Sequence, residues 1–290
     1  MSRQPATIVT GATGGLGRLV VEDLLARGVT AGEIIATGRS IEKIDDLAAR
    51  GVTVRRLDFD DAEALKDAFV AGDRVLLVSG SEVGKRVPQH RAVIDAAVAA
   101  DVAQLVYTSI PKADTTTMQL AAEHRLTEEA IAASGVPATI LRNSWYLEGY
   151  ASQVPTYLEH GVLGSAGDGR VSGATRADFA EAAAVVLAAP AADHLGRTYE
   201  LGGDESFTLT DLAAAVAAAT GQDVAYVEVP ADQQLAILEA AGLPEPFPAI
   251  MVDVDQHIRE GALEVAGHDL STLLGRPTTT LAEALAAAAS

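Results

Sequence analysis

Glycines recur at intervals of three residues in the segment TGATGGLGR, which begins at Thr10. They follow the apolar run at residues 6–9 and precede a stretch of helical period. In this context Gly11 permits a tight turn, Gly14 lets a pyrophosphate approach the backbone, and Gly17 lets the helix pack on its strand. The helix N-terminus adds free N–H groups and a positive dipole end. The segment predicts a dinucleotide-binding turn; a glycine-rich turn without a ligand is the alternative.

The residue that contacts the ribose at its 2′ position is expected about 20 residues farther on, at the end of the second strand. An NAD site has Asp or Glu there, but residues 37–40 read TGRS. A guanidinium suits a 2′-phosphate, so Arg39 predicts NADP(H), with an ordinary loop arginine as the alternative. Asp58 closes the third expected strand, where an adenine edge would lie. It is equally consistent with a cap for the helix that begins near Ala62.

The elements that position these residues alternate along the chain, with short β-branched runs between Ala/Leu-rich stretches of helical period. The expected strands are Ala6–Thr10, Glu33–Thr37, Val52–Leu57, Arg74–Ser79, Gln104–Ser109, Pro137–Arg142 and Thr198–Leu201. The expected helices include Leu16–Arg27, Ala62–Ala71, Gln89–Ala100 and Met118–Ser134. This alternation predicts a doubly wound α/β fold of the Rossmann type, built on a parallel sheet.

The domain organisation changes after about Tyr150, where Gly-rich turns and then helices with Pro-marked loops replace the regular alternation. We expect residues 1–150 to form an NADP-binding domain that is completed by about 174–203. Residues 151–173 and 204–290 are interpreted as a smaller substrate lobe.

Composition limits the classes of partner. The 290 residues carry a net charge of −19, which argues against nucleic acid and anionic membranes. No apolar run approaches the roughly 20 residues that cross a bilayer, and the start leads directly into a strand without a signal peptide. We therefore expect a cytoplasmic protein. The absence of cysteine excludes disulfides, thiolate metal sites and cysteine nucleophiles, and we expect no metal.

The spacing Thr-Gly-x-x-Gly-x-x-Gly resembles the atypical, NmrA-like branch of the short-chain dehydrogenase/reductase superfamily. Within that branch, five further blocks are similar to the bacterial type 2 NAD(P)H:quinone oxidoreductases. The blocks are SGSEVGKRVPQHR (79–91), LVYTS (105–109), LRNSWYLE (141–148), ATRADFA (174–180) and GRPTTTLAE (275–283). The resemblance covers nearly the whole chain, and it implies NADPH as cofactor and a quinone as small-molecule substrate.

The resemblance also implies residues for the site, with the pyrophosphate held by residues 11–16 and the 2′-phosphate by Arg39. The full set of candidate cofactor-binding residues is Gly11, Ala12, Thr13, Gly14, Gly15, Leu16, Arg39, Asp58, Ser79, Gly80, Ser81, Ser109, Asn143, Ser144, Trp145, Tyr146 and Arg176. Asn143 and Tyr146 are also candidate catalytic residues near the nicotinamide. Trp145, Tyr146 and Tyr150 are expected to form an apolar surface against a flat ring, with packing in the core as the alternative.

The chain departs from ordinary short-chain dehydrogenases because no tyrosine is followed by lysine four residues later. That lysine lowers the pKa of a tyrosine that exchanges a proton with a carbonyl. After Ser109, where the motif is expected, the chain has an i,i+4 pair, His124 and Glu128. His124 is a candidate proton donor oriented by Glu128, with a solvated pair as the alternative. Without the dyad, a quinone is the favoured acceptor, because water can protonate its resonance-stabilised reduced anion.

Two other functions are consistent with the sequence. NmrA-like proteins include non-catalytic NADP(H)-binding redox sensors, and a sensor binds nucleotide without oxidising NADPH in the presence of quinones. A reductase of another small substrate is the second alternative, since residues 205–209 and the following helix also occur in sugar-nucleotide relatives. The missing Tyr–Lys dyad counts against this second alternative.

Overall fold

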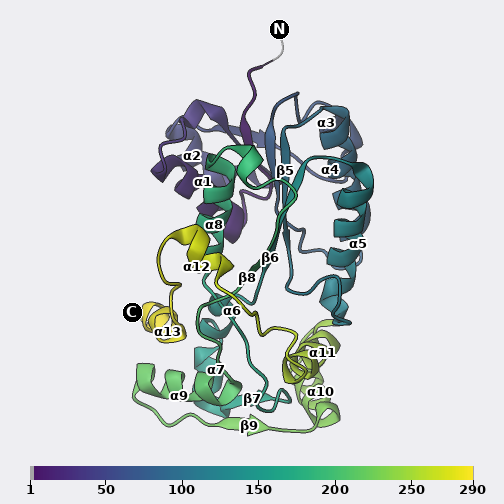
Figure 1. The fold of residues 1–290 in the computed structure, drawn as a ribbon. Coiled ribbons are helices and arrows are strands. Elements are labelled where there is room, and N and C mark those ends of the chain that lie inside the picture. The colour runs from purple at the N-terminus through teal and green to yellow at the C-terminus, as the bar shows by residue number, and fades with distance from the viewer. Residues whose placement is uncertain (1–2, 290) are drawn as a thin grey trace. The chain divides into compact units, whose positions relative to one another are not determined.

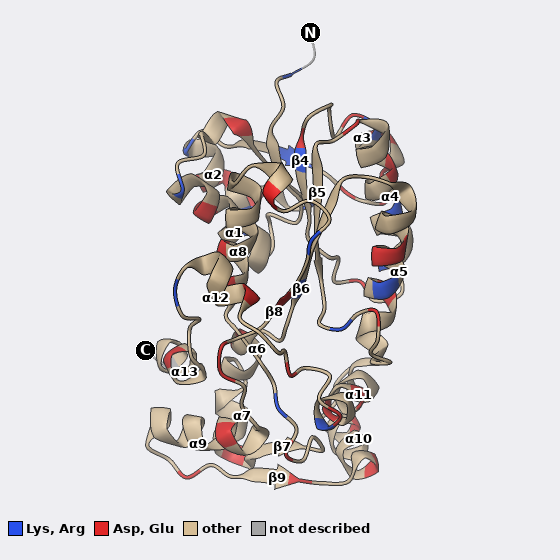
Figure 2. Cartoon of the chain, in the orientation of Figure 1, with Lys and Arg blue, Asp and Glu red and all other residues tan. Residues whose placement is uncertain are grey.

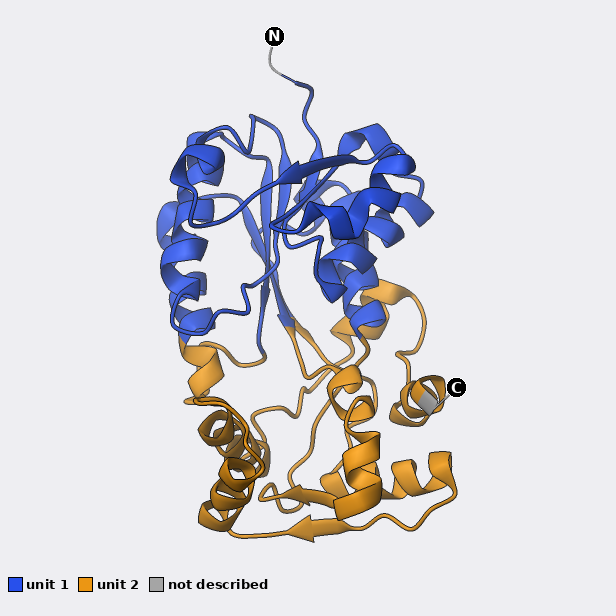
Figure 3. Ribbon diagram, turned by 180° about the vertical axis from the view of Figure 1, so that it is seen from behind, with its two compact units in different colours: residues 1–110, 123–142, 176–199 blue, residues 111–122, 143–175, 200–290 orange. Residues whose placement is uncertain are grey.

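The computed structural model describes residues 3–289, which divide into two compact units (Figure 3). The first unit comprises residues 1–110, 123–142 and 176–199, and the second comprises 111–122, 143–175 and 200–290. Compared with the expected division, residues 111–122, 143–150, 174–175 and 200–203 lie in the second unit. The contacts explain the difference for the earlier segment: Lys112 Nζ donates to Gly261 O at 2.6 Å and Gln119 N donates to Asp253 Oδ2 at 2.8 Å.

The first unit is built on a seven-stranded sheet of order β3-β2-β1-β4-β5-β6-β8 (Figure 1). The strands are β1 (Thr7–Val9), β2 (Ile34–Gly38), β3 (Thr53–Arg56), β4 (Arg74–Leu77), β5 (Gln104–Ser109), β6 (Ala138–Asn143) and β8 (Thr198–Leu201). Neighbours from β3 through β6 pair in parallel, and the strand order reverses direction at β1. All seven expected strands are present, and the doubly wound α/β fold is confirmed.

Helices cover both faces of this sheet (Figure 1). They are α1 (Gly15–Ala26), α2 (Asp45–Ala49), α3 (Ala62–Lys66), α4 (Arg86–Ala99), α5 (Gln119–Ser134) and α8 (Arg176–Ala188). Short 3₁₀ turns lie at Ala31–Glu33, Ile41–Ile44 and Ala191–Asp193. Buried strand residues such as Val75 and Leu105 pack with Ile94 of α4 and Ile131 of α5. Because both faces are covered, Val75, Leu76 and Leu77 of β4 form a continuous buried apolar run.

The second unit contains mostly helices and a small parallel sheet of β7 (Val162–Gly164) and β9 (Tyr226–Glu228). Its helices are α6 (Leu147–Ala151), α7 (Val154–His160), α9 (Leu209–Thr220), α10 (Ala231–Ala240), α11 (Phe247–Arg259), α12 (Asp269–Leu274) and α13 (Leu281–Ala289). The sequence analysis did not find β7 or β9, because three residues are too few to show a strand period. Within residues 3–289, none of the helices has the length and apolarity that a bilayer crossing requires.

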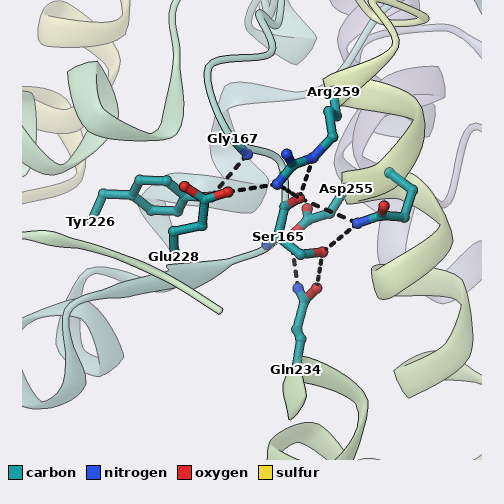
Figure 4. A network of polar contacts seen from close by, with 8 residues as sticks. Ser165, Gly167, Tyr226, Glu228, Gln234, Asp255 and Arg259 are labelled. Atoms are coloured by element: carbon teal, nitrogen blue, oxygen red, sulfur yellow. Dashed lines mark hydrogen bonds and ion pairs between the residues drawn. The ribbon is translucent and has the colours of Figure 1, made fainter. Parts of the chain in front are cut away.

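A polar network joins β7, β9, α10 and α11 inside the second unit (Figure 4). Asp255 Oδ2 accepts hydrogen bonds from Ser165 N at 2.8 Å and Gln234 Nε2 at 2.7 Å. Ser165 O in turn accepts from Arg259 Nη2 at 2.8 Å. Burial raises the pKa of Asp255 above its ordinary value. A Cβ at Gly164 would stand 2.8 Å from Asp255 Oδ2, so only glycine fits beside this carboxylate.

Candidate nucleotide-binding site

The turn after β1 has the close backbone contacts that its glycines predict. Gly11 adopts a φ of +62°, and Gly11 O accepts a hydrogen bond from Gly14 N at 2.9 Å. A Cβ at Gly17 would lie 2.5 Å from Gly11 O. Gly17 therefore lets the helix approach the turn itself, rather than the strand as we expected. The tight turn expected at Gly11 is confirmed.

The N-terminus of α1 carries no anionic cap of its own. Gly14 is the N-cap and makes no side-chain cap hydrogen bond, and the first turn has no acidic residue. Side-chain oxygens of Asp61 and Thr208 cap α3 and α9, whereas α2, α4, α6, α7, α10, α11 and α12 also lack a side-chain cap. The side chain of Arg176 lies against this turn, because a Cβ at Gly15 would be 3.5 Å from its Cδ. An uncapped helix end beside a guanidinium suits a diphosphate.

The turn is also fitted to the end of β2. Ala12 N donates to Thr37 O at 2.8 Å, and a Cβ at Gly38 would lie 2.6 Å from Thr13 Oγ1. Thr13 thus packs on the bare backbone of Gly38, one residue before Arg39. The sequence analysis did not assign Gly38 a role, although its position directly after an apolar strand was the available signal.

Two guanidinium groups lie at the carboxyl ends of β2 and β3. Arg39 is exposed over 58% of its side chain and forms an ion pair with Glu82. Arg56 pairs in register with Gly38, donates a hydrogen bond to Arg39 O, and is 65% exposed. Each guanidinium also faces a carboxylate, Arg39 that of Glu82 and Arg56 that of Glu42 at 3.8 Å, in a chain whose helices carry many acidic side chains (Figure 2). Arg56 was missed because only the strand register brings it to Arg39.

The loop after β4 is held by hydrogen bonds from β5 and α4. Ser79 N donates to Thr108 Oγ1 at 2.9 Å, and Gly80 N donates to His90 Nε2 at 3.0 Å. Arg86 Nε donates to Gly80 O at 2.5 Å. Burial lowers the pKa of His90 to about 4, so its ring is neutral at pH 7 and Nε2 is able to accept. The backbone of the candidate residues 79 and 80 is therefore fixed without any ligand.

Asp58 and Ser81 lie at the rim of this region. Asp58 is half-buried, and its Oδ1 accepts from Asp60 N at 3.1 Å in a local turn. The alternative interpretation of Asp58 as a helix cap is wrong, because Asp61 caps α3 through hydrogen bonds from Glu63 N and Ala64 N. Ser81 is exposed. Neither side chain is committed to the core, so both stay candidates for nucleotide contacts.

The expected orientation of His124 by Glu128 is wrong. His124 is 6% exposed, and its Nδ1 lies 2.8 Å from Tyr107 Oη. Glu128 instead accepts from Ser109 Oγ at 2.5 Å and forms a salt bridge with Arg142 Nη2 at 2.6 Å. The two residues share an i,i+4 spacing, but their side chains bond to different strand residues. Burial lowers the pKa of His124 to about 3, which leaves the ring neutral near pH 7.

Asn143 ends β6 with an unsatisfied side chain. Its Oδ1 and Nδ2 are both buried and have no hydrogen-bond partner, and the same holds for Ser144 Oγ. Buried amides are costly without partners, so a ligand group with both a donor and an acceptor would suit this position. A carboxamide, such as that of nicotinamide, offers both.

The aromatic candidates follow Asn143 in the second unit. Trp145 and Tyr146 are half-buried, and Tyr146 is the N-cap residue of α6. Tyr150 packs edge-on against Phe207, with ring centroids 5.6 Å apart and an interplanar angle of 80°. Tyr150 thus takes part in the packing of its own unit, and all three aromatic side chains are half-buried.

A family model described as NAD(P)H-binding matches residues 11–190 of the chain. The chain belongs to this NAD(P)H-binding family. The match includes the glycine turn, Arg39, the loop after β4 and Asn143. The cofactor class expected from the glycine turn is therefore confirmed.

Individual relatives are similar to this protein over nearly the whole chain. Quinone oxidoreductase 2 of Escherichia coli strain K12 is 46% identical over 278 residues, which are 96% of each chain. A crystal structure of the NADPH-dependent quinone oxidoreductase QOR2 of that species, complexed with NADPH, aligns with a TM-score of 0.93. That alignment covers 97% of this chain and 99% of the other, at 45% identity. The resemblance to the type 2 quinone oxidoreductases is confirmed.

A relative with a different acceptor shares the fold as well. The triphenylmethane reductase of a Citrobacter species, complexed with NADP(H), aligns with a TM-score of 0.90 at 34% identity. The alignment covers 98% of this chain and 99% of that one. Both of these solved relatives are thus described as complexes with NADPH or NADP(H).

Proposed function

We propose that this chain is an NADPH-dependent quinone oxidoreductase. The observation that carries the proposal is the 46% identity to a quinone oxidoreductase over 96% of both chains. The uncapped N-terminus of α1 and the arginines at the ends of β2 and β3 support NADPH as its reductant.

Each part of the nucleotide has residues that suit it. The first turn of α1 and Arg176 would bind the diphosphate, and Arg39 with Arg56 would bind the 2′-phosphate. The amide of Asn143 would satisfy its hydrogen bonds on the nicotinamide carboxamide. NADPH, when bound, supplies the hydride. The residues named here bind and orient, which supplies much of the rate of a transfer between held reactants.

The proton is proposed to come from water. Burial raises the pKa of Tyr107, so its phenol stays protonated, and His124 is neutral with a pKa of about 3. Neither group exchanges a proton readily near pH 7, where general acids work best with a pKa close to the ambient pH. Quinone reduction tolerates this arrangement because the hydroquinone anion is resonance-stabilised. Reduction of a simple ketone does not, because an alkoxide needs a positioned acid.

Trp145 and Tyr146 are proposed to contact the quinone ring, since they follow Asn143 directly and retain exposed surface. Their flat apolar faces suit an aromatic acceptor.

The test is steady-state NADPH oxidation with benzoquinones, naphthoquinones, a triphenylmethane dye and unactivated ketones. We expect turnover with quinones and little or none with the ketones. An enzyme that reduced ketones efficiently would contradict the water-protonation scheme. A chain that bound NADPH but oxidised it with no acceptor in the panel would instead be a redox sensor.

A further inference from the structure

The guanidinium proposed to bind the 2′-phosphate forms an ion pair with an acidic side chain. Glu82 Oε1 pairs with Arg39 Nη1, and Glu82 Oε2 lies 3.1 Å from Lys85 Nζ. Its side chain is 32% exposed, compared with 58% for Arg39 and 64% for Lys85. The two cations hold the pKa of the Glu82 carboxyl below its ordinary value. Glu82 is therefore an anion at neutral pH.

The segment that carries Glu82 is fixed in place. Gly84 N donates to both carboxylate oxygens of Glu123 at 3.1 Å, and Arg86 Nε donates to Gly80 O at 2.5 Å. Lys85 N donates to Glu82 O at 3.0 Å. Glu82 thus sits on an anchored turn, and its contact with Arg39 links the carboxyl end of β2 to the loop after β4.

We propose that Glu82 competes with the cofactor's 2′-phosphate for Arg39 and so sets how strongly the chain prefers NADPH to NADH. This inference rests on the proposed binding of NADPH at Arg39. A 2′-phosphate that takes the guanidinium must displace the carboxylate or lie beside it, and like charges at close range repel. NADH carries no charge at this position and leaves the pair intact. Glu82 therefore weakens NADPH binding selectively.

The test is the affinity of Glu82→Gln for NADPH and NADH, measured by titration of nucleotide fluorescence. The amide keeps the shape of the side chain and removes the charge. We expect NADPH to bind about two- to fivefold more tightly and NADH affinity to stay unchanged, in line with exposed ion pairs of modest strength. The gain should shrink in high salt, because exposed charges are screened.

The matched control is Glu63→Gln. Glu63 pairs with Lys66 at i,i+3, as Glu82 pairs with Lys85, and it belongs to the same unit. This variant makes the same change in net charge at a pair that does not contact Arg39. It should leave both affinities unchanged. In an Arg39→Ala background, Glu82→Gln should lose most of its effect on NADPH.

Three results would overturn the proposal. Weaker NADPH binding by Glu82→Gln would make Glu82 a support that orients Arg39. An equal gain for NADPH and NADH would be an unspecific charge effect. Weaker NADH binding would mean that Glu82 contacts the ribose hydroxyl. These readouts do not depend on turnover, so failure to reduce quinones would refute the proposed function and leave the competition measurable with 2′,5′-ADP against 5′-AMP.

Discussion

Acidification should destabilise this protein well above the pH at which most carboxylates protonate, because two buried histidines must stay neutral in the folded chain. His90 is fully buried, with Nε2 accepting from Gly80 N and Nδ1 bonded to Thr127 Oγ1 at 3.0 Å. His124 is buried against Tyr107. Burial lowers their pKa values to about 4 and about 3, from 6.5 in the unfolded chain.

The sign follows from which state binds protons. Below pH 6.5 the unfolded chain takes up a proton on each histidine, whereas the folded chain stays neutral until the pH approaches the lowered values. The free energy of unfolding is therefore highest above pH 6.5 and falls as the pH drops. With about 1.4 kcal/mol per pKa unit, each histidine costs about 2 kcal/mol between pH 7 and pH 5, and the pair costs about 4 kcal/mol.

The assay is urea unfolding at pH 7 and pH 5 for the wild-type chain and His90→Gln. A glutamine oxygen still accepts from Gly80 N but does not titrate, so the loss attributable to the two histidines should fall by about half, or about 2 kcal/mol. Burial also lowers the pKa of His194, but this residue is present in both proteins, so the difference between them reports on His90. Equal pH dependence of the two proteins would show that His90 is not held neutral and would refute this reasoning.

Three further substitutions test the site. Arg39→Ala should weaken NADPH binding by roughly 1–2 kcal/mol, about five- to thirtyfold, because a charge-assisted contact is lost. The loss is moderate because Arg39 already pairs with Glu82 in the free protein. Titration with both nucleotides should show the loss for NADPH alone, and equal losses would exclude the 2′-phosphate role. Trp145→Ala should raise the KM for quinone far more than the Kd for NADPH, with folding checked by circular dichroism; a loss confined to NADPH would make the ring a cofactor or core element. His124→Ala should keep quinone kcat within about tenfold, below the 10²–10⁴-fold of a positioned acid; a larger loss with folding and NADPH binding intact would make His124 the acid.

The sheet was predictable because its information is local. Most of the seven strands are short runs of β-branched and other apolar residues next to a helical stretch, and the glycine turn carries its own spacing. The three-residue strands β7 and β9 lack such a signal, since their pairing comes from packing in the second unit.

Side-chain partners were less predictable than elements. The i,i+4 spacing of His124 and Glu128 states that they share a helix face, but the neighbouring strands decide that one meets Tyr107 and the other Arg142. Arg56 reaches Arg39 through the register of β2 and β3, which the sequence does not encode locally. The unsatisfied amide of Asn143 likewise emerges only from burial in the folded chain.

The most direct test of the account is a single-turnover experiment in the absence of oxygen. The chain is loaded with one equivalent of NADPH and mixed with excess benzoquinone, and the absorbance of NADPH is followed while hydroquinone is quantified against a protein-free control. Direct hydride transfer predicts enzyme-dependent loss of one NADPH for each hydroquinone formed, at a rate no slower than steady-state turnover. If bound NADPH is lost no faster than in the protein-free control, the proposed function is contradicted.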